Sequence, residues 1–415
     1  MLPIHGGINF KNNEKTNSVS IQSFTTPERV FLNIPQGYTV NVSVNNAVDV
    51  GQVIAFPADE KNSPVYSSIS GIIENISSEC ITIKNDFKNR IHSGLSPVEL
   101  PLKELSEKEI ESLSRLMCIY DGDIPLSQKI KESVGKIENV IISCTDTEPP
   151  AGIRFPLLKE FTKELLGGIK ILIHATKARR GIITISETNE DFSVKLKNLI
   201  TDKNLITIRI LENKYPLEAP KYLLYALTRK EYQQENLIKD SKCLVLSPES
   251  VIALYNSFTT GIPQLYKSIA VSGNIPESKN ISVPQGTKIS EILNLCTLEL
   301  KEKTQIINGG IMSGVSINSD DILPIGCERI TVLEPREEKK RSCIRCGKCI
   351  DSCPMLLKPL LLYSNAINSN DENNLNSGII HCIECGCCTY VCPSKIPLSN
   401  EIIKSKHNVL FNTDK

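Results

Sequence analysis

The sequence predicts a multidomain α/β protein that ends in a small helical domain. Three observations lead to this prediction. Residues 31–100 alternate apolar and polar side chains between turn residues, residues 104–270 alternate helix-like with strand-like segments, and nine of the fifteen cysteines lie between residues 343 and 392. Because a domain usually takes about 100–200 residues, a chain of 415 residues has room for about two to four domains.

The first domain is predicted to consist of short β-strands. The stretches VSVNNAVDVGQVIAF and VYSSISGIIENI place apolar residues at every second position, and Gly, Asn and Asp interrupt them. A period of two puts alternate side chains on opposite faces of a strand, so this pattern favours a small β-sandwich or barrel. We place this domain at residues 1–103.

The second domain, residues 104–270, has an α/β pattern. ELSEKEIESLSRLM predicts a helix in which Ser106 is the N-cap and Glu109 completes a capping box. KIENVIISC and RRGIITIS predict buried strands, and FPLLKEFTKELLGG predicts a helix that ends at its glycine pair. Alternating helices and strands favour a parallel or mixed sheet.

A third module, residues 271–334, is strand-like again, with one short helix expected at Ser290–Cys296. The charged run EPREEKKR (334–341) has no apolar stripe and predicts a solvated linker to a last domain at residues 342–405.

Composition and charge exclude several functions. Lys+Arg and Asp+Glu are both 47, and Trp is absent, so the chain lacks the basic surface and the stacking platform of a nucleic-acid-binding protein. The sequence contains no run of about eighteen apolar residues, so no transmembrane segment is predicted. The N-terminal residues do not resemble an export signal. We therefore expect a cytoplasmic protein, which is compatible with a peripheral place on the cytoplasmic face of a membrane.

The chemistry is concentrated in a duplicated cysteine motif. CIRCGKCIDSCP (343–354) and CIECGCCTYVCP (382–393) both have the pattern C-x2-C-x2-C-x3-C-P, the spacing of bacterial ferredoxin-type [4Fe–4S] sites. In such pairs the first three thiolates hold one cluster and the fourth ligates the other. The predicted ligands are therefore Cys343, Cys346, Cys349 and Cys392 for cluster 1, and Cys353, Cys382, Cys385 and Cys388 for cluster 2.

Other interpretations of these cysteines are weaker. Zinc sites use four ligands per ion, often with His, and disulfides are rare in the reducing cytoplasm. Cys387 lies inside the second motif but off its spacing, so it is predicted to be a spare thiol. Gly347 and Gly386 are expected to keep side chains away from the places where the backbone approaches cluster sulfur.

With these motifs placed, the whole chain resembles the RnfC family, the C subunits of Rnf/Rsx ion-translocating electron transport complexes, which are related to a cobalamin reductase and a proline reductase-associated carrier. INGGIMSGVSINSDDILPI is similar to the family's GGPMMG segment, and NKYPLEAPKYLLYALT to its K-Y-P-x-G-x-E-x-x-L stretch. The resemblance implies a barrel-sandwich hybrid N-terminal domain, an α/β domain like the FMN- and NADH-binding flavoprotein of complex I, a soluble-ligand-binding β-grasp (SLBB) module and a dicluster ferredoxin-like domain.

The flavin and nucleotide motifs of that family are altered here. Where members usually carry a glycine-rich loop, this chain has CIYDGDIPLSQKI, which retains Gly122 and adds Asp121 and Asp123. Members' N-G-A-E-C-E-P becomes SCTDTEP, in which Glu148 matches, and Glu218 replaces the glycine of YP-x-G. Carboxylates repel a phosphate and cannot donate hydrogen bonds to it. The resemblance therefore implies that the usual FMN and NADH site is lost.

A variant pocket is the alternative. Gly122 and Glu148 are then the candidate cofactor-binding residues, with Glu148 contacting a ribose or nicotinamide and Lys129 standing near the altered loop. The simpler interpretation is that Glu148 is an exposed carboxylate and Lys129 a solvated helix lysine. Cys118 and Cys144 flank the same place; we interpret them as buried small side chains rather than redox-active thiols.

Two function hypotheses follow. The favoured one is an electron relay through two [4Fe–4S] clusters between a donor and a partner, either Rnf-type membrane subunits or a soluble reductase. The alternative is an NADH:acceptor oxidoreductase whose bound FMN splits the two electrons of a hydride. A scaffold in which the clusters serve only folding is the least favoured.

Overall fold

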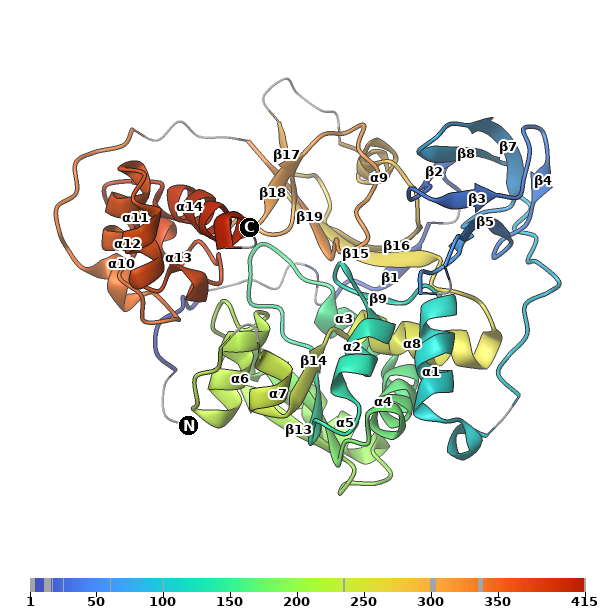
Figure 1. Ribbon diagram of the computed structural model, residues 1–415, viewed down its shortest axis with the longest axis horizontal. Helices are drawn as coiled ribbons and strands as arrows, with labels where there is room; N and C mark the ends of the chain where they lie inside the picture. Colours follow the sequence, from blue (N-terminus) through green and yellow to red (C-terminus); the bar gives the residue numbers. More distant parts are fainter. Residues whose placement is uncertain are drawn as a thin grey trace.

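The computed structural model consists of four modules arranged along the chain (Figure 1). The barrel and the helical C-terminal module lie at opposite ends of the molecule, and the α/β domain and a mixed sheet lie between them. The structure describes residues 4–413 except for 11–15, 17, 25, 60, 100, 234–235, 299–303 and 335–338. Half of the predicted charged linker, residues 335–338, thus lies outside the described residues.

The N-terminal module is a small antiparallel barrel, as the alternating pattern predicts. Its two sheets have the strand orders β2-β8-β7-β4 and β3-β5-β6. Val30, Ile54, Ile73, Ile81 and Ile83 have no exposed surface and form its core, and each contributes about 1.5–3 kcal/mol by leaving water. The strands are β2 (Arg29–Asn33), β3 (Tyr38–Val40), β4 (Ala47–Val48), β5 (Val53–Pro57), β6 (Val65–Tyr66), β7 (Gly71–Ile76) and β8 (Cys80–Asn85).

The central α/β domain is built on a parallel sheet with the order β13-β12-β11-β14. Ile141 of β11 is the register partner of Ile182 on one side and of Val245 on the other, so apolar residues line up across the sheet. A short hairpin of β9 and β10 precedes it. The strands are β9 (Tyr120–Asp121), β10 (Ile124–Pro125), β11 (Asn139–Ser143), β12 (Arg180–Ser186), β13 (Ile206–Leu211) and β14 (Cys243–Leu246).

Helices pack around this sheet. The helix α1 has the predicted capping box, because the Ser106 side chain accepts from the N–H of Glu109 and the Glu109 carboxylate accepts from the N–H of Ser106. The helices are η1 (Leu102–Glu104), α1 (Glu107–Leu116), α2 (Leu126–Ser133), α3 (Arg154–Glu160), α4 (Thr162–Thr176), η2 (Glu187–Asn189), α5 (Glu190–Leu199), α6 (Pro220–Thr228), α7 (Leu237–Ser241) and α8 (Pro248–Thr260).

One predicted helix boundary is wrong. The glycine pair Gly167–Gly168 does not end a helix; α4 continues through it to Thr176. A Cβ on Gly168 would lie 2.1 Å from the carbonyl oxygen of Val251 on α8. The glycines are therefore required because α4 and α8 pack closely, and not because the chain turns there.

The third module is a six-stranded mixed sheet with the order β1-β16-β15-β19-β17-β18, on which α9 (Ile289–Leu295) packs. The helix agrees with the one expected at Ser290–Cys296, and the arrangement agrees with the β-grasp module that the resemblance implies. Strand β1 comes from the start of the chain and pairs in parallel with β16. The strands are β1 (Ile21–Ser23), β15 (Tyr266–Gly273), β16 (Lys279–Pro284), β17 (Gln305–Asn308), β18 (Val315–Ile317) and β19 (Arg329–Leu333).

The C-terminal module is helical and contains both cysteine motifs. Leu362, Ile379, Leu398 and Ile402 are buried in its core. The half-buried thiols of the motifs pack against that core. Its helices are α10 (Lys348–Asp351), α11 (Pro359–Ile367), α12 (Asp371–Asn376), η3 (Ile379–His381), α13 (Cys387–Tyr390) and α14 (Leu398–Thr413).

Candidate functional site

The two cysteine loops have the same backbone conformation. Two residues after the first cysteine, Arg345 has a φ of 54° and Glu384 a φ of 59°, both in the left-handed region. In each loop this residue's N–H points back to the first thiol, so that Arg345 donates to Cys343 Sγ and Glu384 to Cys382 Sγ, each at 3.4 Å. The sequence duplication is therefore also a structural one.

The second group of predicted ligands converges on one space. Cys353 from the first motif and Cys382, Cys385 and Cys388 from the second line a single cavity whose other walls are largely apolar. Burial raises the pKa of the Cys388 thiol, and the charges of the three other thiols raise it further. The fourth cysteine of one motif thus faces the first three of the other.

In the first group, Cys346, Cys349 and Cys392 lie close enough to interact electrostatically. Burial raises the pKa of the Cys349 thiol, backbone N–H groups lower it, and the charges of Cys346 and Cys392 raise it. Cys392 therefore lies with the first motif, although it comes from the second. Cys343 and Cys346 are exposed to solvent.

The other interpretations of the cysteines gain no support from the geometry. All fifteen cysteines are free, so none is in a disulfide. In the described part of the chain, no three His, Cys, Asp or Glu side chains gather closely enough to hold one metal ion. The spare Cys387 is fully buried and shares a hydrogen bond with Cys385.

The second group is shielded by other parts of the chain, which the sequence did not predict. The N–H of Gly7 donates to the Ser352 carbonyl at 2.9 Å. Tyr215 Oη donates to the Cys385 carbonyl at 2.6 Å. A Cβ on Gly386 would lie 2.4 Å from the Met312 carbonyl oxygen. In Figure 1 the N-terminal segment runs between the helical module and the α/β domain, and α13 faces that side.

A second candidate site is a cavity of about 390 Å³ at the junction of the α/β domain, the mixed sheet and the cysteine module. It brings together Gly122 and Glu148, the two candidate cofactor-binding residues, and it reaches Cys385. This is the place where the resemblance puts a flavin and nucleotide pocket, so the partners of its polar groups decide what it can bind.

The carboxylate of Asp121 lies at the N-terminus of α8, where a bound anion would otherwise lie. It ends β9 in the hairpin that stands where the family has a glycine-rich loop, and its Oδ1 accepts from the N–H of Ser247 and the hydroxyl of Ser250, both at 2.8 Å. Ser247 is the N-cap of α8. A helix N-terminus attracts phosphate through its unpaired N–H groups, and here a carboxylate of the protein takes that place.

Lys129 neutralises Asp121. Its Nζ lies 2.6 Å from Asp121 Oδ2, and its side chain is only 18% exposed. The interpretation of Lys129 as a solvated helix lysine is therefore wrong. Burial acts to raise the pKa of Asp121, but the charge of Lys129 and the hydrogen bonds from Lys129 and Ser247 outweigh it and hold that pKa below its usual value.

Glu148 is buried, so its interpretation as an exposed carboxylate is also wrong. Its Oε1 accepts from the N–H groups of Met312 and Ser313 at 2.9 and 2.8 Å. Glu218, which stands where the family has glycine, accepts from the backbone N–H groups of Thr147 and Glu148. The carboxylates of Glu148 and Glu218 therefore accept hydrogen bonds from backbone N–H groups that a bound anion would otherwise use.

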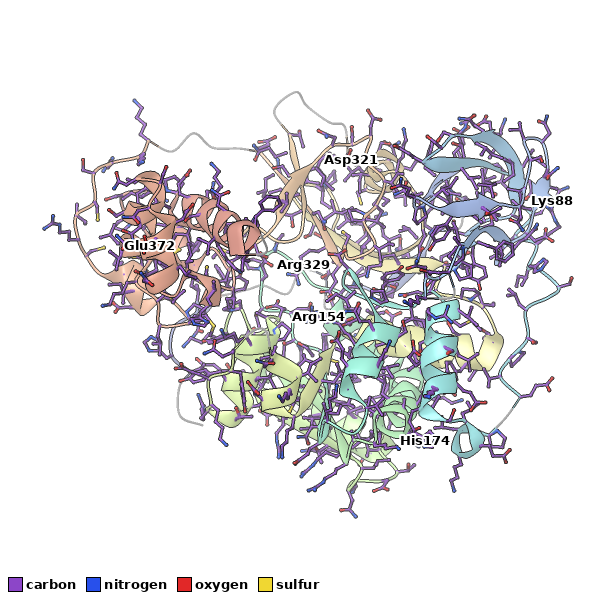
Figure 2. All side chains as sticks on the ribbon, viewed as in Figure 1. Lys88, Arg154, His174, Asp321, Arg329 and Glu372 are labelled. Atoms are coloured by element: carbon purple, nitrogen blue, oxygen red, sulfur yellow. The ribbon has the colours of Figure 1, made fainter. Side chains whose placement is uncertain are left out.

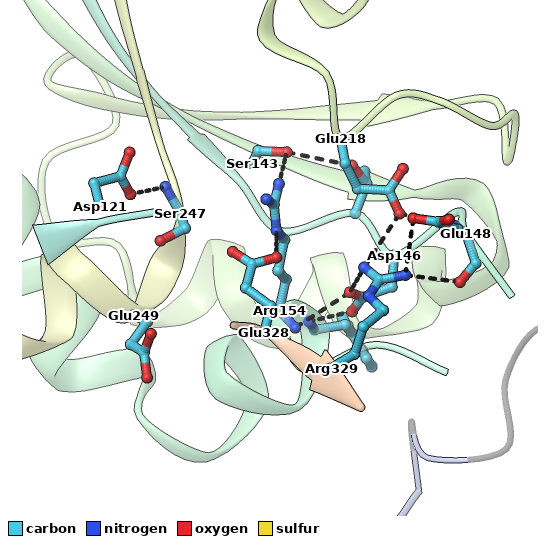
Figure 3. Close-up of polar contacts among 12 residues, drawn as sticks. Asp121, Ser143, Asp146, Glu148, Arg154, Glu218, Ser247, Glu249, Glu328 and Arg329 are labelled. Carbon is cyan, nitrogen blue, oxygen red and sulfur yellow. Dashed lines mark hydrogen bonds and ion pairs between the residues drawn. The ribbon is translucent and has the colours of Figure 1, made fainter. Parts of the chain in front are cut away.

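The buried Arg329 and the partly buried Arg154 pair with carboxylates of this cavity (Figure 3). Arg329 pairs with Glu218, Asp146 and Glu148 at 3.6, 3.8 and 3.9 Å. Figure 2 places Arg329 and Arg154 at the centre of the molecule, between the domains.

Arg154 closes the network on its other side. Its Nε lies 2.8 Å from Glu328, and its Nη1 donates to Ser143 Oγ at 3.1 Å. Sequence reasoning missed the two arginines and Glu328. The available signal was the adjacent pair Glu328–Arg329 at the start of the otherwise apolar strand RITVL.

Cys118 and Cys144 are not arranged as reactive thiols. Cys144 has no exposed surface, and Cys118 Sγ donates to the Pro64 carbonyl at 3.0 Å. Burial raises the pKa of Cys118 to about 12 and also raises that of Cys144. A thiol that stays protonated is a poor nucleophile.

Three family models match successive parts of the chain. Residues 2–96 match the RnfC barrel sandwich hybrid domain, residues 114–256 the Nuo51 FMN-binding domain, and residues 336–394 the 4Fe-4S dicluster domain. These matches confirm the predicted barrel-sandwich, flavoprotein-like and dicluster modules in the predicted order.

Relatives match over most of the chain. The C subunit of the ion-translocating oxidoreductase complex of Buchnera aphidicola subsp. Acyrthosiphon pisum is 30% identical over 404 residues, which are 93% of this chain and 85% of that relative. The chain belongs to the RnfC family, the C subunits of ion-translocating oxidoreductase complexes. The RnfC-type relative from the proton-translocating ferredoxin:NAD(+) oxidoreductase complex of Clostridium ljungdahlii is 27% identical over 381 residues, 86% of this chain and 83% of that relative.

Membership of the RnfC family agrees with a solved structure at the level of the fold. An NAD+-reducing [NiFe]-hydrogenase in its air-oxidized state aligns with a TM-score of 0.50 and 12% identity, covering 74% of this chain and 63% of that one. As an RnfC protein with a 4Fe-4S dicluster domain, the chain is an electron-transfer protein. None of the helices in the described ranges combines the length and apolar character of a membrane span.

Proposed function

We propose that this RnfC protein passes electrons between a donor and a partner redox protein or membrane complex through two [4Fe–4S] clusters, and that it binds no flavin of its own. The observation that carries the first part is the cavity shared by Cys353, Cys382, Cys385 and Cys388. Interleaved ligation requires this convergence of two motifs that lie far apart in the sequence.

The residues around the thiols fit iron–sulfur clusters. When bound, each cluster supplies one centre for one-electron transfer. The chain would hold cluster 1 with Cys343, Cys346, Cys349 and Cys392, and cluster 2 with Cys353, Cys382, Cys385 and Cys388. Backbone N–H groups directed at the sulfurs stabilise negative charge there, as those of Arg345 and Glu384 do for Cys343 and Cys382.

The two groups of cysteines differ in their exposure to solvent. This difference indicates at which group the proposed electron path meets a partner protein. The segment around Gly7, the Tyr215 hydroxyl and the Met312 loop contact the backbone beside the second group, whose four thiols are buried or partly buried. The first group presents Cys343 and Cys346 to solvent. Electrons would therefore be exchanged with a partner protein most directly at the first group.

The α/β cavity does not fit FMN or NADH. A phosphate needs unpaired N–H donors or cations, whereas here Asp121 takes the N-terminus of α8 and Glu218 takes two backbone N–H groups. Arg329 and Arg154 are paired with four carboxylates of the protein. A phosphate would have to displace these anions from buried positions.

Anaerobic purification with iron, sulfide and flavin assays tests both parts of the proposal. Two four-iron clusters require about eight irons per chain, and we expect no flavin and no saturable quenching of the fluorescence of added FMN. Colourless, iron-free protein from such a preparation would refute the relay.

The alternative is an NADH:acceptor oxidoreductase with bound FMN. The match of residues 114–256 to the Nuo51 FMN-binding domain favours it. It requires one flavin per chain and bleaching of the cluster absorbance by NADH. Either result would replace the flavin-free proposal.

A further inference from the structure

The two cysteine loops have the same backbone conformation, but one is covered by the rest of the chain and the other is exposed. This difference indicates a docking surface for a partner protein. Gly347 and Gly386 have φ values of 79° and 71°, and the residue two positions before each is also left-handed. Each position in one loop therefore has a structural counterpart in the other, and their neighbours can be compared directly.

The second loop is packed against the rest of the chain. Ile383 packs on the apolar cluster that contains Leu217 and Tyr222. Gly386 lies against the Met312 carbonyl, and the Cys385 carbonyl accepts from Tyr215. This face of the loop is thus an interface between domains within the chain.

The equivalent face of the first loop is open. Ile344, the counterpart of Ile383, is 68% exposed. A Cβ on Gly347 would meet no atom within 4 Å, in contrast to Gly386. Cys343 and Cys346 are exposed beside it. The face that is an interface within the chain in the second loop is therefore accessible to another protein in the first loop.

The charge of this face indicates the kind of protein. Arg341, Arg345 and Lys348 are exposed and lie within four positions of Ile344 in the sequence, and the exposed acidic Asp351 follows them. In the second loop, Glu384 and Cys387 replace Arg345 and Lys348. The formal net charge of the whole chain is zero, so this basic group is a local feature. It would attract an acidic surface and speed its association.

We propose that the basic face, defined as Arg341, Ile344, Arg345 and Lys348, docks an electron-transfer protein whose own docking surface is acidic. The inference rests on the proposed clusters, because the exposed thiols are what such a partner must approach. Arginine and lysine at the rim select the partner by charge, and Ile344 supplies apolar contact at the centre. A membrane surface is less favoured because one apolar side chain at the centre buries little in lipid.

The test uses the intact, cluster-loaded protein and two small redox proteins of opposite charge. Flavodoxin serves as the acidic probe and cytochrome c as the basic probe. Binding of each is measured by calorimetry with all centres oxidised, and reoxidation of reduced flavodoxin is followed by stopped flow, both at several salt concentrations. We expect flavodoxin to bind more tightly than cytochrome c, and its binding to weaken with added salt.

Charge-reversal variants locate the site. Glu384 holds the equivalent position in the second loop and has the same left-handed conformation as Arg345. A glutamate is therefore compatible with this backbone, and the loop of Arg345→Glu should still fold. Arg345→Glu with Lys348→Glu should weaken flavodoxin binding about tenfold or more at low salt and less at high salt. Lys88→Glu is the matched control, since Lys88 is exposed on the barrel at the far end of the molecule (Figure 2).

The outcomes separate the inference from the proposed function. Absence of iron from the wild-type protein would remove the clusters and with them the relay. Iron-loaded protein that does not bind flavodoxin, or whose variants bind it as the wild type does, would overturn the docking face alone. So would binding to phosphatidylglycerol vesicles that Arg345→Glu abolishes while flavodoxin binding persists, because the face would then be a membrane contact.

Discussion

The hydroxyl of Tyr215 donates a hydrogen bond of 2.6 Å to the carbonyl of Cys385. Tyr215 follows β13 of the α/β domain and lines its cavity, whereas Cys385 belongs to the second cysteine loop. This bond therefore joins the α/β domain to the second cysteine loop. The α/β domain matches an FMN-binding domain, and the loop is proposed to hold cluster 2.

Tyr215→Phe removes that bond and little else. We expect a loss of about 1 kcal/mol in the free energy of unfolding, and a change in the electron paramagnetic resonance spectrum and midpoint potential of one cluster, because hydrogen bonding around a cluster sets its potential. Redox titration of the purified variant measures this.

Tyr66→Phe is the control for Tyr215→Phe. Tyr66 Oη also donates to a backbone carbonyl, that of Leu116, at 2.9 Å, but it lies in the barrel. It should lower stability by a similar amount and leave both cluster spectra unchanged. Equal spectra in the two variants would contradict a role of Tyr215 at the second loop.

Asp121→Asn should destabilise the protein in a pH-dependent way. The pKa of Asp121 is held below its usual value by Lys129 and by hydrogen bonds, against the effect of burial. Its contribution is therefore present above the unfolded pKa of about 3.9 and is lost as the pH falls through the folded pKa. We expect a loss of about 1–3 kcal/mol at pH 7 that shrinks below about pH 4.

Urea denaturation across this pH range checks the prediction for Asp121. The neighbouring Asp123→Asn is the control, since Asp123 is exposed in the same hairpin. It should change stability little at any pH. A constant difference between Asp121→Asn and the wild type from pH 7 to pH 3 would show that the ionised carboxylate is not what stabilises the site.

Arg329→Met leaves three buried carboxylates without their shared cation. Asp146, Glu148 and Glu218 all pair with Arg329 within 3.9 Å. Removal of one partner from a buried ion pair costs about 3–5 kcal/mol, which chemical denaturation can measure. Arg29→Met, which breaks an exposed pair with Glu74, should have a much smaller effect. Equal effects of the two substitutions would count against the buried network.

The two loop glycines form a matched pair. Gly347→Ala costs the strain of a left-handed alanine, about 1–2 kcal/mol, and adds no overlap with another protein atom, because a Cβ there meets none within 4 Å. Gly386→Ala adds an overlap with the Met312 carbonyl. We expect limited proteolysis to release the cysteine module more readily from the Gly386 variant. Similar proteolysis of both variants would argue against tight packing of the second loop.

The spare thiol gives a clean test of the ligand assignment. Cys387→Ser should retain about eight irons, whereas Cys388→Ser should lose up to about half of them. Iron and sulfide analysis after anaerobic purification decides this. Full loading of the Cys388 variant would mean that Cys387 can replace it as a ligand, and the assigned spacing would then be wrong.

The fold was predictable from sequence where periodicity is strong. Alternation identified the barrel, the buried runs KIENVIISC and RRGIITIS identified β11 and β12, and Ser106 with Glu109 located the start of α1. The interleaved pairing of the cysteine motifs was inferred from their spacing, and the assignment of ligands to the two clusters stays a prediction. These features depend on residues close together in the chain.

The failures come from tertiary contacts that periodicity does not encode, between distant segments for Glu148 and Gly168 and between a hairpin and the next helix for Lys129. Glu148 is buried because Met312 and Ser313 cover it, and Lys129 is paired because a hairpin brings Asp121 to it. Gly168 lies where α4 and α8 pack closely against each other. Nothing near these residues in the sequence indicates such partners, so a polar side chain was taken as exposed and a glycine as a helix end.

The attachment of the N-terminal segment also affects how the molecule is made. Gly7 bonds to Ser352, and Ile8 pairs with Tyr215. During synthesis the segment leaves the ribosome early and must wait for both partners, the last of which belongs to the cysteine module. The contact between the N-terminal segment and the cysteine module can therefore form only after nearly the whole chain has been made, so the segment is among the last parts to be fixed in place.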